Sequence, residues 1–212
     1  GGAALWPMVA VGEKKYYFSA MFAALTAYTD ANNADVPYES PSNKDLRITA
    51  TVLKDGTTVA LDQQQANDVL NANGVITAIN ANGFKSWGNN TAAYPSTTDP
   101  KDRWWAVRRF FDWDGNNFIQ TYFQKVDKPG NKRLIQSIVD SQNIIGNGYV
   151  ARDYCAGYRI EFRDDENPIT DLLDGKLTTH TYLAPYIPAE KIVNIREYDT
   201  AALEAALTGG SD

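Results

Sequence analysis

Histidine and cysteine, on which many enzyme active sites and metal centres depend, are almost absent from this sequence. The 212 residues include one of each, His180 and Cys155. One cysteine excludes a disulfide framework within the chain and cannot complete a zinc site alone. Nucleophilic catalysis needs a base beside the nucleophile, and His180, in a run of alternating residues, is better interpreted as a surface or interface residue. We therefore expect no enzyme and no catalytic, cofactor-binding or metal site.

Positive charge and long apolar runs are also scarce. Twenty Lys and Arg residues against 26 Asp and Glu residues give a net charge of −6, whereas nucleic-acid binding needs clustered cations. The apolar opening, residues 1–12, is too short to cross a bilayer and lacks a basic leader. We expect neither a nucleic-acid partner nor insertion into a membrane. A start at Gly-Gly that leads directly into a predicted strand favours a piece of a longer protein.

Two acidic clusters could be mistaken for metal sites. Asp112 and Asp114 alternate as in a calcium loop, but the glycine of such a loop would fall at Asn117 and its bidentate glutamate at Phe123. The acidic run at 164–166 is typical of a solvated turn before a helix N-terminus, where negative charge is favourable. Neither cluster predicts a bound metal ion.

What the sequence does contain is a dense aromatic stretch at residues 103–126, with three of the five tryptophans. Its apolar residues recur at helical spacing and predict a buried face. They are Trp104, Val107, Phe111, Phe118, Ile119, Tyr122, Phe123 and Val126. We expect a core helix, or two helices that meet at residues 114–117, where glycine and asparagine relax the helical backbone.

Arg108 and Arg109 lie on the polar side of this stretch. Adjacent residues point about 100° apart on a helix, so both cannot lie over the aromatic face. Two interpretations remain open. The arginines either lie over the rim of the core beside local carboxylates, or they contact another subunit.

Shorter patterns predict helices and strands on both sides of the aromatic stretch. Before it, we expect a strand at 3–11 interrupted by Pro7, a helix ending near 29–33, a hairpin over 48–61, a short helix capped by Asp62 and Gln65, and a hairpin over 75–87. After it, we expect a helix following Asn131, strands near 158–162, 177–183 and 192–198, a short helix capped by Asn167, and a last helix at 200–207.

These elements predict an α+β fold with helices packed on small antiparallel sheets. The run at 88–101, rich in Asn, Thr, Ser and Pro, favours a boundary between two subdomains. We place them at residues 1–98 and 99–212.

Several short motifs occur in the order in which one protein family carries them. They are residues 40–46 (SPSNKDL), 70–75 (LNANGV), 87–88 (WG), 107–110 (VRRF), Asp171 with 175–177 (GKL), and 187–192 (IPAEKI). Together they resemble the C-terminal half of the contractile tail sheath protein of bacteriophages and prophages. The resemblance covers most of residues 6–198.

The resemblance implies a structural protein. Sheath subunits stack as rings or a helix around a tail tube and shorten together, which drives the tube through a cell envelope. The implied partners are neighbouring sheath subunits, the tail tube protein and the baseplate. The implied location is the virion tail, preceded by the host cytoplasm before assembly. Residues 1–98 would be part of the sheath central domain, and residues 99–212 its C-terminal domain.

Sheath proteins also extend their chain termini into neighbouring subunits and add strands to a sheet there. A heterologous contact that does not close on itself builds an open helical polymer, and strand addition supplies main-chain hydrogen bonds without a pocket. The predicted strands at 177–183 and 192–198 are the expected edges. Candidate inter-subunit contacts are Arg108, Arg109, Leu177, Thr179, Thr181, Ile192, Asn194 and Arg196. The alternative is a carbohydrate- or protein-binding module without catalytic activity, which the aromatic content of 12% would suit.

Overall fold

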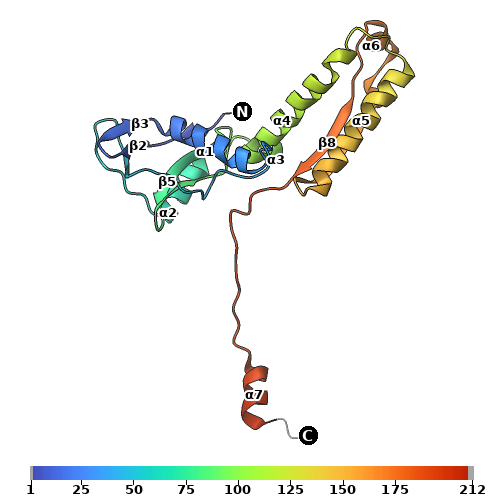
Figure 1. Ribbon diagram of the computed structural model, residues 1–212. Helices are drawn as coiled ribbons and strands as arrows, with labels where there is room; N and C mark the ends of the chain where they lie inside the picture. Colours follow the sequence, from blue (N-terminus) through green and yellow to red (C-terminus); the bar gives the residue numbers. More distant parts are fainter. Residues whose placement is uncertain (1, 210–212) are drawn as a thin grey trace.

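The structure is a computed structural model that describes residues 2–209. Figure 1 shows two lobes and an arm. The sheet lobe holds the elements from β1 to β6, the helical lobe holds α4, α5, β7 and β8, and the arm comprises residues 186–209. The predicted α+β fold with small sheets is confirmed.

The sheet lobe is built from two three-stranded sheets and one long helix. Its elements are β1 (Ala4–Leu5), β2 (Met8–Val11), β3 (Lys14–Tyr16), α1 (Phe18–Asn32), β4 (Ala50–Val52), β5 (Val75–Asn80) and β6 (Phe84–Trp87). The strand orders are β1-β5-β6 and β3-β2-β4, and only the β1–β5 pair is parallel. Val9, Phe18, Phe22 and Ile76 are buried between these elements and form the core of the lobe.

A short irregular helix connects the two sheets. It consists of α2 (Gln63–Gln65), a π turn η1 (Ala66–Leu70) and a 3-10 turn η2 (Asn71–Asn73). The predicted capping box is confirmed, because the Gln65 amide donates to Asp62 Oδ1 at 2.7 Å and the Asp62 amide donates to Gln65 Oε1 at 3.3 Å. The segment ends at Gly74, where φ is 72° and a side chain would overlap backbone oxygens of Thr91 and Tyr94.

The predicted hairpin over 48–61 forms only in part. Strand β4 has no regular partner after the turn, where a single bridge joins Val52 to Thr58 and the Val59 amide donates to the Thr51 carbonyl at 2.8 Å. The chain leaves the sheet at this point to enter α2.

The helical lobe packs two long antiparallel helices against a two-stranded sheet (Figure 1). Its elements are α3 (Pro100–Arg103), α4 (Trp105–Tyr122), η3 (Phe123–Lys125), α5 (Lys132–Ala151), β7 (Cys155–Glu161), η4 (Asp164–Glu166), α6 (Ile169–Leu173) and β8 (His180–Pro185). Phe110, Tyr149, Tyr158 and Ile160 are buried in its core. The predicted cap of α5 is confirmed, because the Leu134 amide donates to Asn131 Oδ1 at 2.9 Å.

Of the two alternatives for the aromatic stretch, the single core helix is confirmed, and the break at residues 114–117 does not occur. Helix α4 runs through them without interruption, and the backbone turns instead at Trp104, where φ is −86° and ψ is 123°. A glycine inside a helix costs about 1 kcal/mol relative to alanine, and packing of the aromatic residues of α4 against α5 and β7 offsets this cost.

Asp114 belongs to a buried polar cluster and caps no helix. The Tyr158 hydroxyl donates to its Oδ2 at 3.3 Å and accepts from Gln142 Nε2 at 2.7 Å. Asp114 Oδ1 and Gln142 Oε1 are buried and have no hydrogen-bond partner among the described residues. Burial raises the pKa of Asp114 to about 6, against a smaller opposite effect from the Tyr158 hydrogen bond.

Strand β8 begins three residues later than predicted, at His180 instead of 177. The Asn167 side chain explains the delay, because it accepts from the Thr178 amide at 2.7 Å and donates to the Thr178 carbonyl at 2.9 Å. Asn167 is therefore not the cap of α6, which starts at Ile169 after Pro168. From His180 onward the strand pairs with β7, with Thr181 opposite Ile160 and Leu183 opposite Tyr158.

Candidate inter-subunit surfaces

The arm is the part of the chain that packs least against the rest. After Pro185 the chain passes along the junction of the two lobes as far as Glu190, and it then extends away from them toward α7 (Thr200–Thr208), as Figure 1 shows. Ile192, Ile195 and Tyr198 have 88%, 81% and 74% of their surface exposed. A contiguous run of exposed apolar side chains is typical of an interaction site, so the arm is a candidate for contact with another molecule.

The predicted third strand of the helical lobe does not form within this chain. Residues 192–198 are extended but make no ladder with any described strand. Asn194 and Arg196 are exposed, and their side chains make no hydrogen bond or ion pair with other residues in the range 2–209. The predicted extended backbone is present, but the predicted pairing is not.

The two-stranded sheet of the helical lobe has open edges. Helices α4 and α5 cover one face of it (Figure 1), while Arg159 lies over the Tyr182 ring on the other face at 4.0 Å. A shallow groove of about 520 Å³ lies beside β8, lined by Phe111 of α4 and by residues of both strands. Thr181 lines this groove, whereas Leu177 and Thr179 precede the strand.

Arg108 and Arg109 are both paired with carboxylates of this chain, but only the partners of Arg108 are local in the sequence. Arg108 binds Asp102 at 2.8 Å and Asp112 at 2.9 Å. Arg109 makes a bidentate pair with Asp30 at the end of α1, and it thereby ties the helical lobe to the sheet lobe. Contact of either arginine with another subunit stays a prediction.

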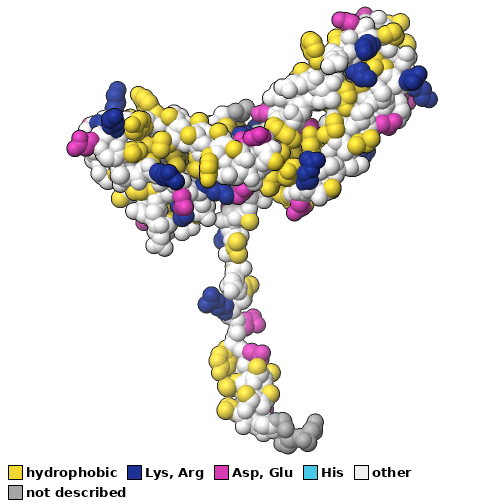
Figure 2. Space-filling view, in the orientation of Figure 1, with side chains coloured by type: hydrophobic (Ala, Val, Ile, Leu, Met, Phe, Trp, Pro, Cys, Tyr) yellow, Lys and Arg dark blue, Asp and Glu magenta, His cyan; other side chains and the backbone are white. Residues whose placement is uncertain are grey.

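The far end of the helical lobe carries a surface that the sequence analysis assigned to the core. Ile119, Phe123 and Val126 are exposed there, beside Ile169 and Leu173 of α6. Basic residues surround them, and none of these forms an ion pair with the described residues: Lys125, Lys128, Lys132 and Arg133. We call this surface the tip; Figure 2 shows yellow and dark blue side chains there, together with some magenta ones.

His180 lies on the surface as predicted. Its Nδ1 is 2.7 Å from Glu166 Oε1, and its ring packs against Tyr182. Among residues 2–209, no group of three or more His, Cys, Asp or Glu residues could hold a metal ion. In the same range, no helix is long and apolar enough to cross a membrane.

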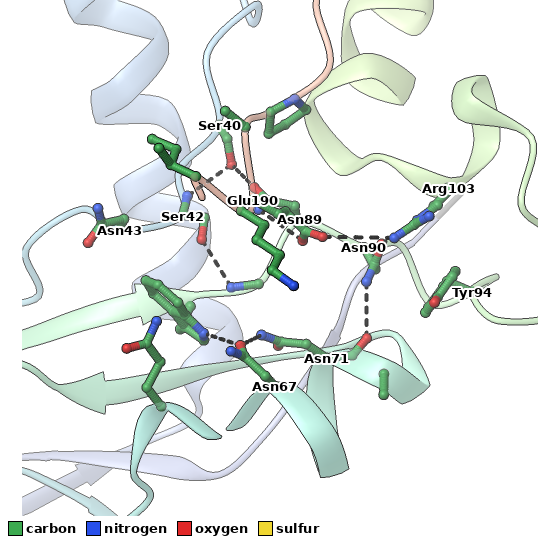
Figure 3. A pocket seen from close by; sticks show the side chains of 18 residues that line it. Ser40, Ser42, Asn43, Asn67, Asn71, Asn89, Asn90, Tyr94, Arg103 and Glu190 are labelled. Atoms are coloured by element: carbon green, nitrogen blue, oxygen red, sulfur yellow. Dashed lines mark hydrogen bonds and ion pairs between the residues drawn. The ribbon is translucent and has the colours of Figure 1, made fainter. Parts of the chain in front are cut away.

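A polar cavity of about 700 Å³ lies where the two lobes and the arm meet (Figure 3). Asn67, Asn71, Asn89 and Asn90 line it, and they bond mainly to one another and to nearby protein groups. Glu190 of the arm enters the cavity and accepts from Asn89 Nδ2 at 3.2 Å. The sequence did not indicate this site, because its members come from five separate stretches of the chain.

Comparison with known proteins identifies relatives of one kind. No family model matches the sequence. The tail sheath protein of Burkholderia phage BcepMu is 29% identical over 175 residues, which are 81% of this chain and 36% of that protein. The major tail sheath protein of Serratia phage KSP20 is 25% identical over 210 residues, which are 97% of this chain and 52% of that protein.

Solved structures of contractile particles share the fold. The match to a chain of the anti-feeding prophage baseplate has a TM-score of 0.80 at 20% identity and covers 94% of this chain and 56% of that one. The match to the contracted helical sheath of the same particle has a TM-score of 0.77 at 20% identity, with coverage of 93% and 56%. The chain thus spans about half the length of these proteins or less. Sequence and fold both relate it to the tail sheath proteins of contractile phages and injection particles.

Proposed function

We propose that this chain forms part of a structural subunit of a contractile sheath, and that its arm docks as a strand on the β7–β8 sheet of a neighbouring copy. The observation that carries the proposal is the arm itself, which over residues 192–198 is extended, exposes Ile192, Ile195 and Tyr198, and pairs with no strand among the described residues. The same chain presents an open sheet edge and a groove beside β8. One chain therefore holds both halves of a strand-addition contact.

The two halves lie apart in a single molecule, because the arm points away from the β7–β8 sheet (Figure 1). Contact between the arm of one copy and the sheet of the next is heterologous, and repeated contacts of this kind form rings or open helices. Such polymerisation agrees with the relatives, which are sheath proteins. No substrate is turned over in this role.

The tip is the surface that we assign to the tail tube. Exposed Ile119 and Phe123 could bury apolar area against a tube. The unpaired cations Lys128 and Lys132 favour an acidic partner, since complementary charge guides and orients association. Replacing both lysines with glutamate should weaken binding to assembled tube protein, while leaving the arm contact unchanged.

The remaining parts of the proposal concern the particle as a whole. The subunit would act in a virion tail or a related injection particle, assemble from the host cytoplasm, and meet a baseplate at one end. Residues 1–98 would belong to the central domain, and 99–212 to the C-terminal domain. Contraction would be a rigid-body change between two packings of the subunits, with the arms keeping neighbours connected.

An aspartate scan of residues 192–198 tests the strand contact. A fluorescent peptide of residues 190–209 is titrated into the chain, and each position is replaced in turn. On a strand, alternate side chains face the partner, so aspartate should weaken binding at least tenfold at alternate positions and little at the others. A peptide of residues 200–209 alone is the control. Absence of binding, or uniform losses along the scan, would contradict the proposal.

Electron microscopy gives the second test. The concentrated protein should show rings or hollow tubes, and removal of residues 192–212 should abolish them while the far-ultraviolet circular dichroism of the lobes is kept. Rings that persist without the arm would show that another surface drives assembly.

A further inference from the structure

The arm leaves the body of the protein at one residue, Glu190. Its Oε1 accepts from Asn89 Nδ2 at 3.2 Å, and its Oε2 lies 3.8 Å from Arg103 Nη2. Beyond it, residues 191–198 make no hydrogen bond or ion pair with the described parts of the two lobes. Glu190 is therefore the last point at which the direction of the arm is fixed.

Asn89 is held so that its amide donor faces the arm. The Ser40 hydroxyl donates to Asn89 Oδ1 at 2.5 Å, which leaves Nδ2 for Glu190. The Asn89 carbonyl also accepts from the Trp105 amide at 2.7 Å, at the start of α4. Because Asn89 is buried and its oxygen is occupied, the donor cannot turn away without losing a hydrogen bond.

Arg103 is restrained in the same way. Its guanidinium group lies between two aromatic rings, 4.4 Å from the centre of Tyr94 and 4.2 Å from that of Trp104. Its Nε donates to Asn90 Oδ1 at 3.0 Å, so that Nη2 is directed toward Glu190 (Figure 3). A planar cation held by stacking and a hydrogen bond loses little freedom when a carboxylate binds.

We propose that Glu190 is a positioning residue for the arm. Its carboxylate occupies a preformed anion receptor made by Asn89 and Arg103, and this contact sets the direction in which residues 191–209 leave the junction of the two lobes. A fixed departure point confines the arm to fewer conformations, which lowers the entropy lost when the arm meets a partner. We call the contact of Glu190 with Asn89 and Arg103 the latch. It lies within a single chain, so it can be tested without knowing what the arm binds.

Distances measured by pulsed electron paramagnetic resonance test the latch in the isolated chain. Spin labels are placed at Gln64→Cys on the sheet lobe and Ile192→Cys on the arm, in a Cys155→Ala background. The parent should give a narrow distance distribution. Glu190→Ala, which removes both contacts, should widen it at least twofold. Glu190→Gln, which can still accept from Asn89 but lacks the charge, should give an intermediate width.

Glu197→Gln is the matched control, because Glu197 is exposed and makes no hydrogen bond or ion pair in the described chain. It should leave the distribution unchanged. Thermal unfolding of each variant checks that the lobes remain folded. An unchanged width in Glu190→Ala, or equal widening in the Glu197 control, would overturn the proposal.

An exchange of donor and acceptor sharpens the test. Asn89→Asp places two carboxylates face to face and should release the arm at neutral pH. Adding Glu190→Gln restores one hydrogen bond, in which the new glutamine donates and the new aspartate accepts. The distance distribution of the double variant should therefore be narrower than that of Asn89→Asp alone. Two residues that act independently would give no such recovery, and its absence would count against a direct latch.

Discussion

The helical lobe and the arm contain similar apolar side chains, but the lobe buries them and the arm exposes them to solvent. Phe110 of the lobe has 0% of its surface exposed, whereas Ile192 of the arm has 88%. In the lobe, burial of apolar area stabilises the fold at about 25 cal/mol per Å². In the arm, that gain is absent until a second molecule covers the residues. The comparison shows that buried apolar residues of the lobe stabilise the fold, whereas exposed apolar residues of the arm are available to stabilise association.

The largest predicted effect is a loss of stability in the helical lobe that leaves the arm unchanged. Phe110→Ala removes a buried ring that packs against Trp113 and Tyr149, and it should lower the free energy of unfolding by about 3–5 kcal/mol. Urea denaturation followed by tryptophan fluorescence measures this change. A loss below about 1 kcal/mol would show that the lobe core is not the stabilising unit.

Two glycines in α5 allow the effect of close packing on stability to be measured apart from the effect of helix propensity. A side chain at Gly146 would overlap the Tyr158 ring, whereas one at Gly148 would meet nothing nearer than 3.9 Å. We expect Gly146→Ala to destabilise the chain by about 1–3 kcal/mol through overpacking. Gly148→Ala should instead stabilise it by up to about 1 kcal/mol, because alanine favours the helix. Equal effects at the two positions, measured by thermal unfolding, would contradict the packing of α5 on β7.

The buried acid of the lobe predicts a pH dependence that the arm should not share. Burial raises the pKa of Asp114 from 3.8 to about 6 in the folded state. Between these values the folded chain holds a proton that the unfolded chain has released, so rising pH favours unfolding. The contribution of Asp114 to the free energy of unfolding should therefore fall from pH 4 to pH 6 and then level off.

Asp114→Asn removes this contribution. Since one pKa unit corresponds to about 1.4 kcal/mol, the difference between parent and variant should change by about 1 kcal/mol or more across that range. Parallel stability curves for the two proteins would show that Asp114 does not titrate there.

The smallest effect is expected in the arm. Ile195→Ala should change the free energy of unfolding by less than about 0.5 kcal/mol, because the residue is 81% exposed and packs on neither lobe. The same substitution should weaken assembly strongly if residue 195 faces the neighbouring sheet. A large loss of monomer stability would show that the arm folds back on its own chain in solution.

The sequence patterns predicted the elements well where a local signal was present. The capping box at Asp62, the cap at Asn131 and the hairpin of β5 and β6 all follow from neighbouring residues. The patterns failed where the deciding contact is remote. Strand β8 starts late because the Thr178 amide donates to Asn167. Asp114 is buried in the lobe beside Tyr158, which is 44 residues away in the sequence and donates a hydrogen bond to it.

The candidate surfaces show the same limit. The segment at 192–198 was predicted to be a strand, but a strand prediction cannot distinguish a partner in the same chain from one in another copy. The tip was assigned to the core because Ile119, Phe123 and Val126 share the helical spacing of buried residues. Tyr122 of α4 is buried and its hydroxyl donates to the Ile138 carbonyl of α5, whereas Ile119 is exposed and Phe123 and Val126 follow the end of α4.

Hydrogen exchange of the amides of residues 192–198 tests the central claim most directly. In the isolated chain these amides should exchange at nearly the rate of an unstructured peptide, since the described structure gives them no ladder partner. In assembled rings or tubes, addition to the β7–β8 sheet of a neighbour should slow alternate amides at least a hundredfold. Fast exchange of the whole segment in both states would contradict the account.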